Sequence, residues 1–224
     1  MSNRTRILVM IVLPLVLTGV VLQSEFFFSR ENVVRAYPPM PMERVVTFPT
    51  TKSRTRRGMA PGIGTLFTRP WEEGPLPRAA MWDELGRAAG STRIPAENVL
   101  MLVADGSVQK FSCLGDLDPY GLQVLTLPGK NRFTHASMRF VGKLVGLRVL
   151  RLPGARITDE CLADLFNLTY LEHLDLQNCP IYDEAVPYLA RLTSLRTLWL
   201  FRTRMSQEGA AELRKQLPDC DIRF

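Results

Sequence analysis

The second half of the chain repeats itself with a fixed period, and this repeat constrains the fold more than any other feature of the sequence. Leucines occupy three positions in each copy, separated by two residues and then by one. These columns are Leu147, Leu171 and Leu195, then Leu150, Leu174 and Leu198, then Leu152, Leu176 and Leu200. An earlier copy from Leu122 to Leu127 fits if one residue is inserted near Gly129. A chain with such a period, about 24 residues, is expected to fold as a stack of similar coils.

The two halves of each repeat predict different secondary structures. Leu150 and Leu152 alternate with other side chains at a period of two, which is typical of a short strand with one buried face. In residues 157–168 the apolar side chains recur every three or four positions, which indicates a helix packed on that strand. Because neighbouring coils bury each other's apolar sides, the predicted fold class is an α/β solenoid with one strand and one helix per repeat.

Polar columns between the leucines support this register. A column of acidic residues falls at the start of the predicted helices, where a carboxylate favours the positive end of the helix dipole. Hydroxyl side chains two positions earlier are suited to capping the helix N-terminus. The acidic residues are Glu160, Glu184 and Glu208, and the candidate caps are Thr158 and Ser206.

The four cysteines, Cys113, Cys161, Cys179 and Cys220, form no C-x-x-C pair and have no histidine at ligand spacing. We therefore expect neither a metal site nor a cofactor. Cys179 shares a column with small or hydrogen-bonding residues where the chain turns inward after the strand. Its predicted role is structural rather than reactive.

Residues 79–121 are predicted to cap the N-terminal end of residues 122–224, which hold the repeats. Residues 80–89 are expected to form a helix that buries Trp82 and Leu85. Residues 99–103 and 108–113 flank Asp105-Gly106, a strong hairpin signal, and are expected to form two paired strands. After Leu217 the last helix should end and one short strand should follow.

The first 28 residues predict a membrane-targeting segment. Arg4 and Arg6 precede an apolar run from Ile7 to Leu22. This run is intermediate in length between a signal-peptide core and the roughly 20 residues that span a bilayer. An uncleaved signal anchor, giving a single-pass transmembrane helix over residues 1–28, is favoured over a cleaved signal peptide. The flanking positive charge places residues from 29 onward outside the cytoplasm in either case.

Residues 29–78 are predicted to be a disordered linker, because prolines and glycines interrupt them and they offer little apolar periodicity. Much of the formal net charge of +6 lies here, at Lys52, Arg54, Arg56 and Arg57. This basic cluster is interpreted as solvated, with contact to anionic lipid as the alternative. No nucleic acid is expected as a partner.

The leucine pattern resembles leucine-rich repeats, whose period lies between about 20 and 29 residues. The segments 157–162 and 217–222 resemble the cysteine-containing, ribonuclease-inhibitor-like type, especially membrane-anchored bacterial proteins that end in Leu-Pro-x-Cys-x-Ile. The resemblance covers about residues 80–224. It implies the solenoid fold and protein binding in general, without naming a partner.

The repeat register also predicts which strand side chains point outward on the concave face of the solenoid. Two large aromatic residues lie there beside charged and polar ones, a composition typical of the centre of an interface. The predicted partner-binding residues are Arg151, His173, Asp175, Gln177, Trp199 and Phe201. The alternative is that another segment of the chain covers the aromatic rings.

The sequence therefore favours a membrane-tethered module that binds a protein on this face. The alternative is a structural or assembly subunit whose solenoid packs permanently within a larger membrane complex. Catalysis is disfavoured because the only histidines, His135 and His173, belong to no nucleophile or zinc-hydrolase motif.

Overall fold

The computed structural model describes residues 43–48, 64–70, 82–105, 111–127, 129 and 133–224. The predicted membrane segment over residues 1–28 and the basic cluster over residues 52–57 lie outside these ranges. Within them, no helix is both long and apolar enough to cross a bilayer.

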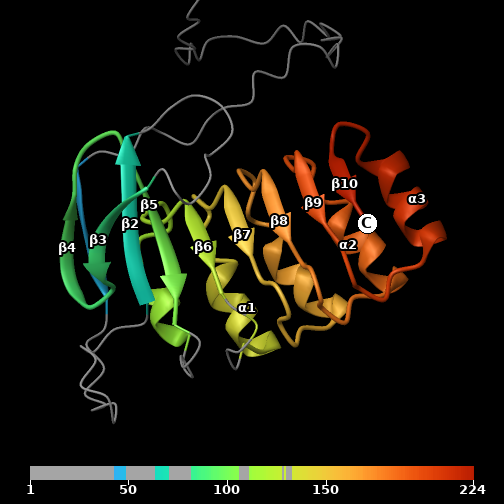
Figure 1. The fold of residues 1–224 in the computed structure, drawn as a ribbon, viewed down its shortest axis with the longest axis horizontal. Helices are drawn as coiled ribbons and strands as arrows, with labels where there is room; N and C mark the ends of the chain where they lie inside the picture. Colours follow the sequence, from blue (N-terminus) through green and yellow to red (C-terminus); the bar gives the residue numbers. More distant parts are fainter. Residues whose placement is uncertain (1–42, 49–63, 71–81, 106–110, 128, 130–132) are drawn as a thin grey trace, which may run out of the picture. The chain divides into compact units, whose positions relative to one another are not determined.

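An eight-stranded sheet runs through the molecule in the order β10-β9-β8-β7-β6-β5-β2-β3 (Figure 1). The strands β5 to β10 pair in parallel, whereas β2 pairs antiparallel with both β5 and β3. Their bounds are β2 Gly64–Pro70, β3 Asp83–Arg87, β5 Asn98–Ala104, β6 Val124–Thr126, β7 Val149–Arg151, β8 His173–Asp175, β9 Thr197–Trp199 and β10 Asp221–Arg223.

The strand pairing confirms the predicted repeat register. Val149 lies opposite His173, and His173 lies opposite Thr197, so each coil advances by the period read from the leucine columns. Val124 lies opposite Val149, one position more than that period, which confirms the single insertion in the first coil. The predicted short strand after Leu217 is also present, as β10, and it pairs with β9.

Each coil returns through helical structure, but not always through an α-helix. The α-helices are α1 His135–Val141, α2 Val186–Leu189 and α3 Gln207–Gln216, and the 3₁₀ helices are η3 Ser112–Asp116, η4 Asp159–Leu165 and η5 Asp183–Ala185. The prediction of one helix per coil is therefore correct, although the coil at η4 uses a 3₁₀ helix throughout. A 3₁₀ helix rises about 2.0 Å per residue, so it covers the length of a coil with fewer residues than an α-helix needs.

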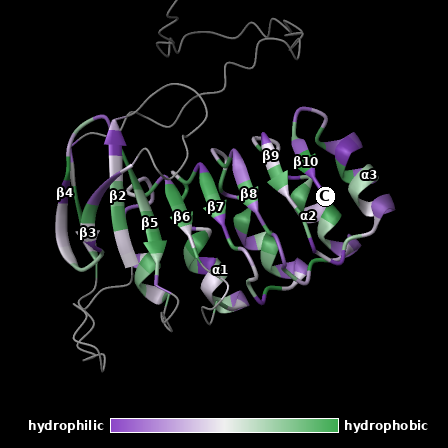
Figure 2. Ribbon diagram, viewed as in Figure 1, coloured by the Kyte–Doolittle hydropathy of each residue, from purple (hydrophilic) through white to green (hydrophobic). Residues whose placement is uncertain are grey.

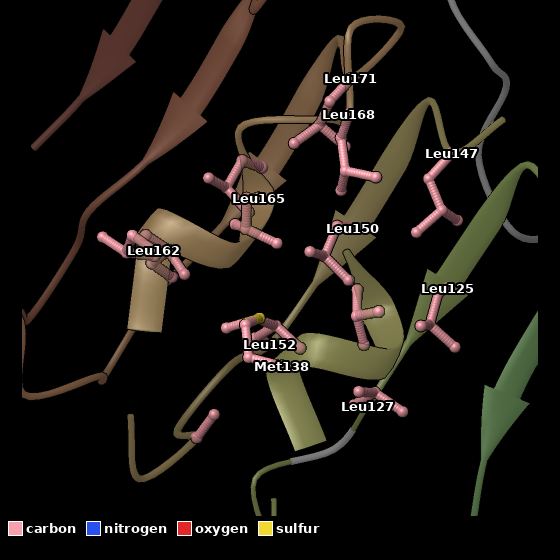
Figure 3. Close-up of a cluster of buried hydrophobic side chains, with 14 of the residues drawn as sticks. Leu125, Leu127, Met138, Leu147, Leu150, Leu152, Leu162, Leu165, Leu168 and Leu171 are labelled. Atoms are coloured by element: carbon pink, nitrogen blue, oxygen red, sulfur yellow. The ribbon is translucent and has the colours of Figure 1, made fainter. Parts of the chain in front are cut away.

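The leucine columns form one continuous core between the strands and the helices. Figure 3 shows leucines of successive coils in this core, with Leu150 between Leu125 of the preceding coil and Leu162 and Leu165 of η4. Each of these four side chains is at most 1% exposed. Burying a leucine completely contributes about 1.5–3 kcal/mol, so the stacked columns are the main source of stability.

Hydrogen bonds also link the starts of successive helical segments. The Asp159 carboxylate accepts from the backbone N–H of Tyr182 at 2.9 Å, and Asp183 accepts from the backbone N–H of Ser206 at 2.7 Å. Ser206 caps α3, as predicted, by accepting from the backbone N–H of Gly209 at 3.0 Å. Thr158 stands at the N-cap of η4, again as predicted.

The predicted disordered linker over residues 29–78 is wrong for two segments. Residues 64–70 form β2, and β1 Arg44–Phe48 pairs antiparallel with β4 Gly90–Ile94 in a separate two-stranded sheet. Val46 and Phe48 are 3% and 1% exposed and belong to the main core. Their alternation with exposed neighbours is short and lies among prolines, which is why it gave no clear strand signal.

The predicted helix over residues 80–89 is also wrong, because residues 83–87 form β3. Gly86 adopts a φ of +108°, which is incompatible with a helix, and the backbone around it pairs with β2. Trp82 is buried as expected, but Leu85 is 40% exposed.

The predicted hairpin between residues 99–103 and 108–113 does not form. The first strand exists as β5, but its two edges are taken by β2 and β6. A third partner has no edge left to pair with. Ser112 and Cys113 belong instead to the 3₁₀ helix η3, and Val108 lies outside the described residues.

Candidate functional site

The side chains of the large sheet that point away from the helices form two columns, which we call the strand face. Side chains alternate between the two sides of a strand, so residues paired in register fall in one column. The first column is Phe67, Met101, Val124, Val149, His173, Thr197 and Asp221. The second is Thr65, Val103, Thr126, Arg151, Asp175, Trp199 and Arg223.

The N-terminal half of the strand face, from β2 to Val149 of β7, is apolar and closed. A hydrophobic cluster forms there that is separate from the main core, and Trp82 packs into it. Val124 and Val149 are only 2% and 3% exposed, although both point away from the helices. The members of this cluster are Trp82, Val99, Met101, Val124 and Val149, with Phe67 and Val103 packed against it. This half therefore offers little apolar surface to a partner.

The C-terminal half, which we call the open half, is polar and aromatic. It comprises Arg151, His173, Thr197, Trp199 and Phe201, none of which is fully buried. Figure 2 shows the change along the sheet, with hydrophobic residues dominating β5 and β6 and hydrophilic ones appearing in β8 and β10. The predicted outward columns are thus present, but only their C-terminal part is accessible.

Two aromatic residues stand at the centre of the open half. Phe201 follows β9 and is 43% exposed. Trp199 is half-buried, and the guanidinium of Arg223 lies 5.9 Å from the centre of its indole ring. Arg223 is held there by Asp221, whose carboxylate accepts from its Nε at 2.8 Å. The predicted intramolecular cover is therefore partial: β10 supplies one cation over Trp199 and leaves Phe201 accessible.

His173 lies beside these rings on β8. Burial lowers the pKa of its imidazole, and the nearby positive charges of Arg148, Arg151 and Arg196 lower it further, while Glu172 acts in the opposite direction. The ring is therefore uncharged at neutral pH. Its Nε2 atom is buried and makes no hydrogen bond in the part of the chain that the structure describes.

Asp175 and Gln177 serve the strand rather than the surface. Asp175 is 7% exposed, and its carboxylate accepts from the backbone N–H of Gln177 at 2.9 Å. Burial raises the pKa of this carboxyl, against the lowering effects of the Gln177 hydrogen bond and of Arg151. Of the six residues predicted to bind a partner, Asp175 is thus the least accessible.

An ion pair that the sequence reasoning missed lies directly behind the open half. Arg148 Nη2 donates to Glu172 Oε2 at 2.8 Å, and their side chains are 1% and 9% exposed. Both residues immediately precede a strand, in a column that also holds Gln123 and Arg196. Four polar residues in one column were the available signal, but the leucine pattern alone does not predict that two of them pair in a buried position.

Cys179 has the structural role that was predicted for it. Its thiol donates to the carbonyl oxygen of Leu152 in the preceding coil at 3.1 Å. Burial raises the pKa of the thiol to about 11, so it stays protonated and unreactive at neutral pH. All four cysteines lie in the described residues, and none of them forms a disulfide bond there.

Comparisons with solved structures find leucine-rich-repeat proteins. An internalin from Listeria monocytogenes superposes with a TM-score of 0.42 at 26% identity, over 51% of this chain and 31% of the internalin. A leucine-rich-repeat protein of Leptospira interrogans gives a TM-score of 0.27 at 19% identity, over 46% of this chain and 47% of its own. This chain thus spans about a third of the first and half of the second. No protein-family model and no curated protein matches it.

These superpositions are too partial to establish the fold, so we identify the fold from the repeated coils themselves. One parallel strand recurs at each repeat, three leucines of each copy fill a shared core, and helical turns cover the side opposite the strand face. The fold is a leucine-rich-repeat solenoid. Repeat solenoids of this kind present an extended surface that is suited to contacting other macromolecules.

Proposed function

We propose that this chain is a protein-interaction module that binds its partner on the open half of the strand face. The observation that carries the proposal is the exposure of Phe201, next to Trp199, on strands that a continuous leucine core holds rigid. Aromatic residues surrounded by polar groups are enriched at the centres of protein interfaces. The closed half beside them confines the contact to Arg151 of β7, to β8, β9 and β10, and to the turns that follow.

We further propose that the module is tethered to a membrane and faces the outside of the cytoplasm. This rests on the apolar run from Ile7 to Leu22 and on the positive charges that precede it. The basic cluster over residues 52–57 would then contact anionic lipid or remain solvated. The cysteine-containing subtype of the repeat and its likeness to membrane-anchored bacterial proteins belong to the same proposal.

The second candidate is a permanent subunit of a larger membrane complex. It is favoured by the burial of the N-terminal half of the strand face, which leaves only the open half to contact a neighbouring subunit. The two functions differ in stoichiometry: a permanent subunit stays in one complex of fixed composition when the full chain is purified in mild detergent. An interaction module is recovered mainly as the free chain, with its partner bound only in part.

The double change Trp199→Ala, Phe201→Ala is expected to weaken partner capture at least tenfold, because truncating an aromatic residue at an interface centre commonly costs about 1 kcal/mol or more. The free energy of unfolding should fall by less than about 2 kcal/mol, since neither ring belongs to the leucine core. Capture is measured by pull-down with the full chain from membranes of the producing cells, and stability by urea denaturation.

Phe166→Ala is the matched control. Phe166 is an aromatic residue that is 54% exposed and follows η4, away from the strand face. The Phe166→Ala change should leave capture of the partner unchanged. If the double change leaves capture intact, the open half is not the binding surface. A stability loss well above the expected limit would show instead that the rings are structural.

A further inference from the structure

We propose that two copies of this chain associate edge to edge through β10, with the two strands antiparallel and Ile222 on the two-fold axis. The large sheets of the two copies then form one continuous sheet. This inference does not depend on the proposed function, because it concerns the edge of the sheet rather than the strand face. Two observations carry it: an open sheet edge with an exposed aromatic residue, and a sequence along that edge that is complementary to itself.

The outer edge of β10 is open in the described part of the chain. β10 lies at one end of the large sheet and pairs there only with β9 (Figure 1). The backbone N–H of Asp221 donates to the carbonyl oxygen of Arg196 at 2.8 Å, on the side of β9. The carbonyl oxygen of Arg223 accepts from the backbone N–H of Leu200 at 2.7 Å, on the same side. Because these groups alternate along a strand, the N–H and C=O of Ile222 face the outer edge, where another strand can pair with them.

One side chain reaches this edge without closing it. Nη2 of Arg214, an exposed residue of α3, donates to the carbonyl oxygen of Ile222 at 3.3 Å. A carbonyl oxygen accepts two hydrogen bonds, so a second strand can pair with Ile222 while Arg214 stays in place. The opposite edge of the sheet is less suited to pairing, because the register between β3 and β2 shifts at Leu85. Such a bulge twists an edge strand away from a possible partner.

The apolar core also reaches the surface at the β10 end of the solenoid. Phe224 stands at the position of the repeat that Leu152, Leu176 and Leu200 occupy in the coils before it. Each of these leucines is 0% exposed, whereas Phe224 is 41% exposed. The difference arises because no further strand of the described residues lies beyond β10. A second copy of the same end would remove part of this aromatic surface from water.

The residues along β10 match themselves in an antiparallel pair. A two-fold axis at Ile222 places Asp221 of each copy opposite Arg223 of the other, and Cys220 opposite Phe224. Charged residues then meet opposite charges on the strand face, and apolar residues meet each other on the helix side. Within one copy, Arg223 Nε already donates to Asp221 Oδ2 at 2.8 Å, and both side chains are more than half exposed. The carboxylate has a second oxygen and the guanidinium has further N–H groups, so each can also pair across the axis. This self-complementarity favours a second copy over an unrelated strand.

Two single substitutions test the pairing because each destroys the complementarity in the opposite sense. Asp221→Arg makes both charges on the strand positive, and Arg223→Asp makes both negative. The native chain is expected to form a reversible dimer whose fraction rises with concentration, because the contact is small. Each variant alone should dimerise at least tenfold more weakly, because like charges then meet across the axis. Dimerisation is measured on the full chain in mild detergent by native mass spectrometry over a concentration series.

Mixing the two variants is the decisive step. An equimolar mixture should form the heterodimer with at least the affinity of the native dimer, because each positive strand then faces a negative one. A substitution that merely disrupted β10 would not be rescued by mixing. Glu160→Arg, which makes the same change in charge at an exposed residue of η4, is the control and should dimerise like the native chain. The inference is overturned if the native chain is monomeric throughout, if either variant dimerises normally, or if mixing restores nothing.

Discussion

Replacing Glu172 with glutamine is expected to lower the free energy of unfolding by about 3–5 kcal/mol, because it breaks a buried ion pair. Glutamine keeps the shape of the side chain but removes its charge. Arg148 would then remain buried, at 1% exposure, without the carboxylate that lies 2.8 Å away in the native pair. The measurement is urea denaturation of the full chain in mild detergent, followed by circular dichroism.

Two further variants separate the lost pair from a general loss of packing. Replacing both residues, as Arg148→Met with Glu172→Leu, should recover most of the stability, because no buried charge is left. Glu160→Gln alters an exposed acidic residue at the start of η4 and should cost at most about 1 kcal/mol. The account of the pair is wrong if Glu172→Gln proves as mild as Glu160→Gln.

Gly142→Ala is expected to be nearly as damaging, at about 3 kcal/mol, for a steric reason. A Cβ atom on Gly142, at the end of α1, would lie well within 3.0 Å of the carbonyl oxygen of Asp164 in the next coil. The Cβ atom is fixed rigidly to the backbone of Gly142, and the oxygen belongs to the backbone of the next coil, so the two coils must separate to make room. The φ of Gly142 is −61°, which alanine adopts freely, so the loss cannot arise from backbone strain.

Gly115→Ala is the matched control for this prediction. Its Cβ would approach a ring carbon of Phe140 at 2.7 Å, but that ring belongs to a half-buried side chain that can rotate. We therefore expect a clearly smaller loss in the same denaturation measurement. If the two substitutions lower the free energy of unfolding equally, the close approach of the two backbones at Gly142 is not the reason that a glycine is needed there.

The repeat could be predicted in detail because each leucine column reports the same local environment several times. A single strand with Leu150 and Leu152 would be ambiguous, but three copies at one spacing leave one register. The same redundancy located the N-caps and the structural role of Cys179, whose thiol bonds the preceding coil.

The N-terminal cap could not be predicted in this way because it does not repeat. Residues 80–89 are rich in good helix formers, yet tertiary pairing with β2 makes residues 83–87 a strand. That pairing depends on residues 64–70, whose own strand signal is hidden among glycines and prolines. The position of each strand follows from contacts between segments far apart in sequence, and local propensity carries no information about them.

The candidate site was predictable in position but not in accessibility. The register placed Trp199 and the outward columns correctly, because alternation on a strand follows from its geometry alone. That the first half of the same face is closed depends on Trp82, which comes from outside the repeats. The commitment of Asp175 to its own backbone turn likewise appears only in three dimensions.

The central claim is that a partner contacts the open half of the strand face. Site-specific photo-cross-linking in the producing cells tests it most directly, with benzoylphenylalanine placed at Phe201 or, as the control, at Phe166. We predict one discrete adduct from position 201 that disappears in the Trp199→Ala background, and none from position 166. An adduct from position 166 with none from position 201 would contradict the account.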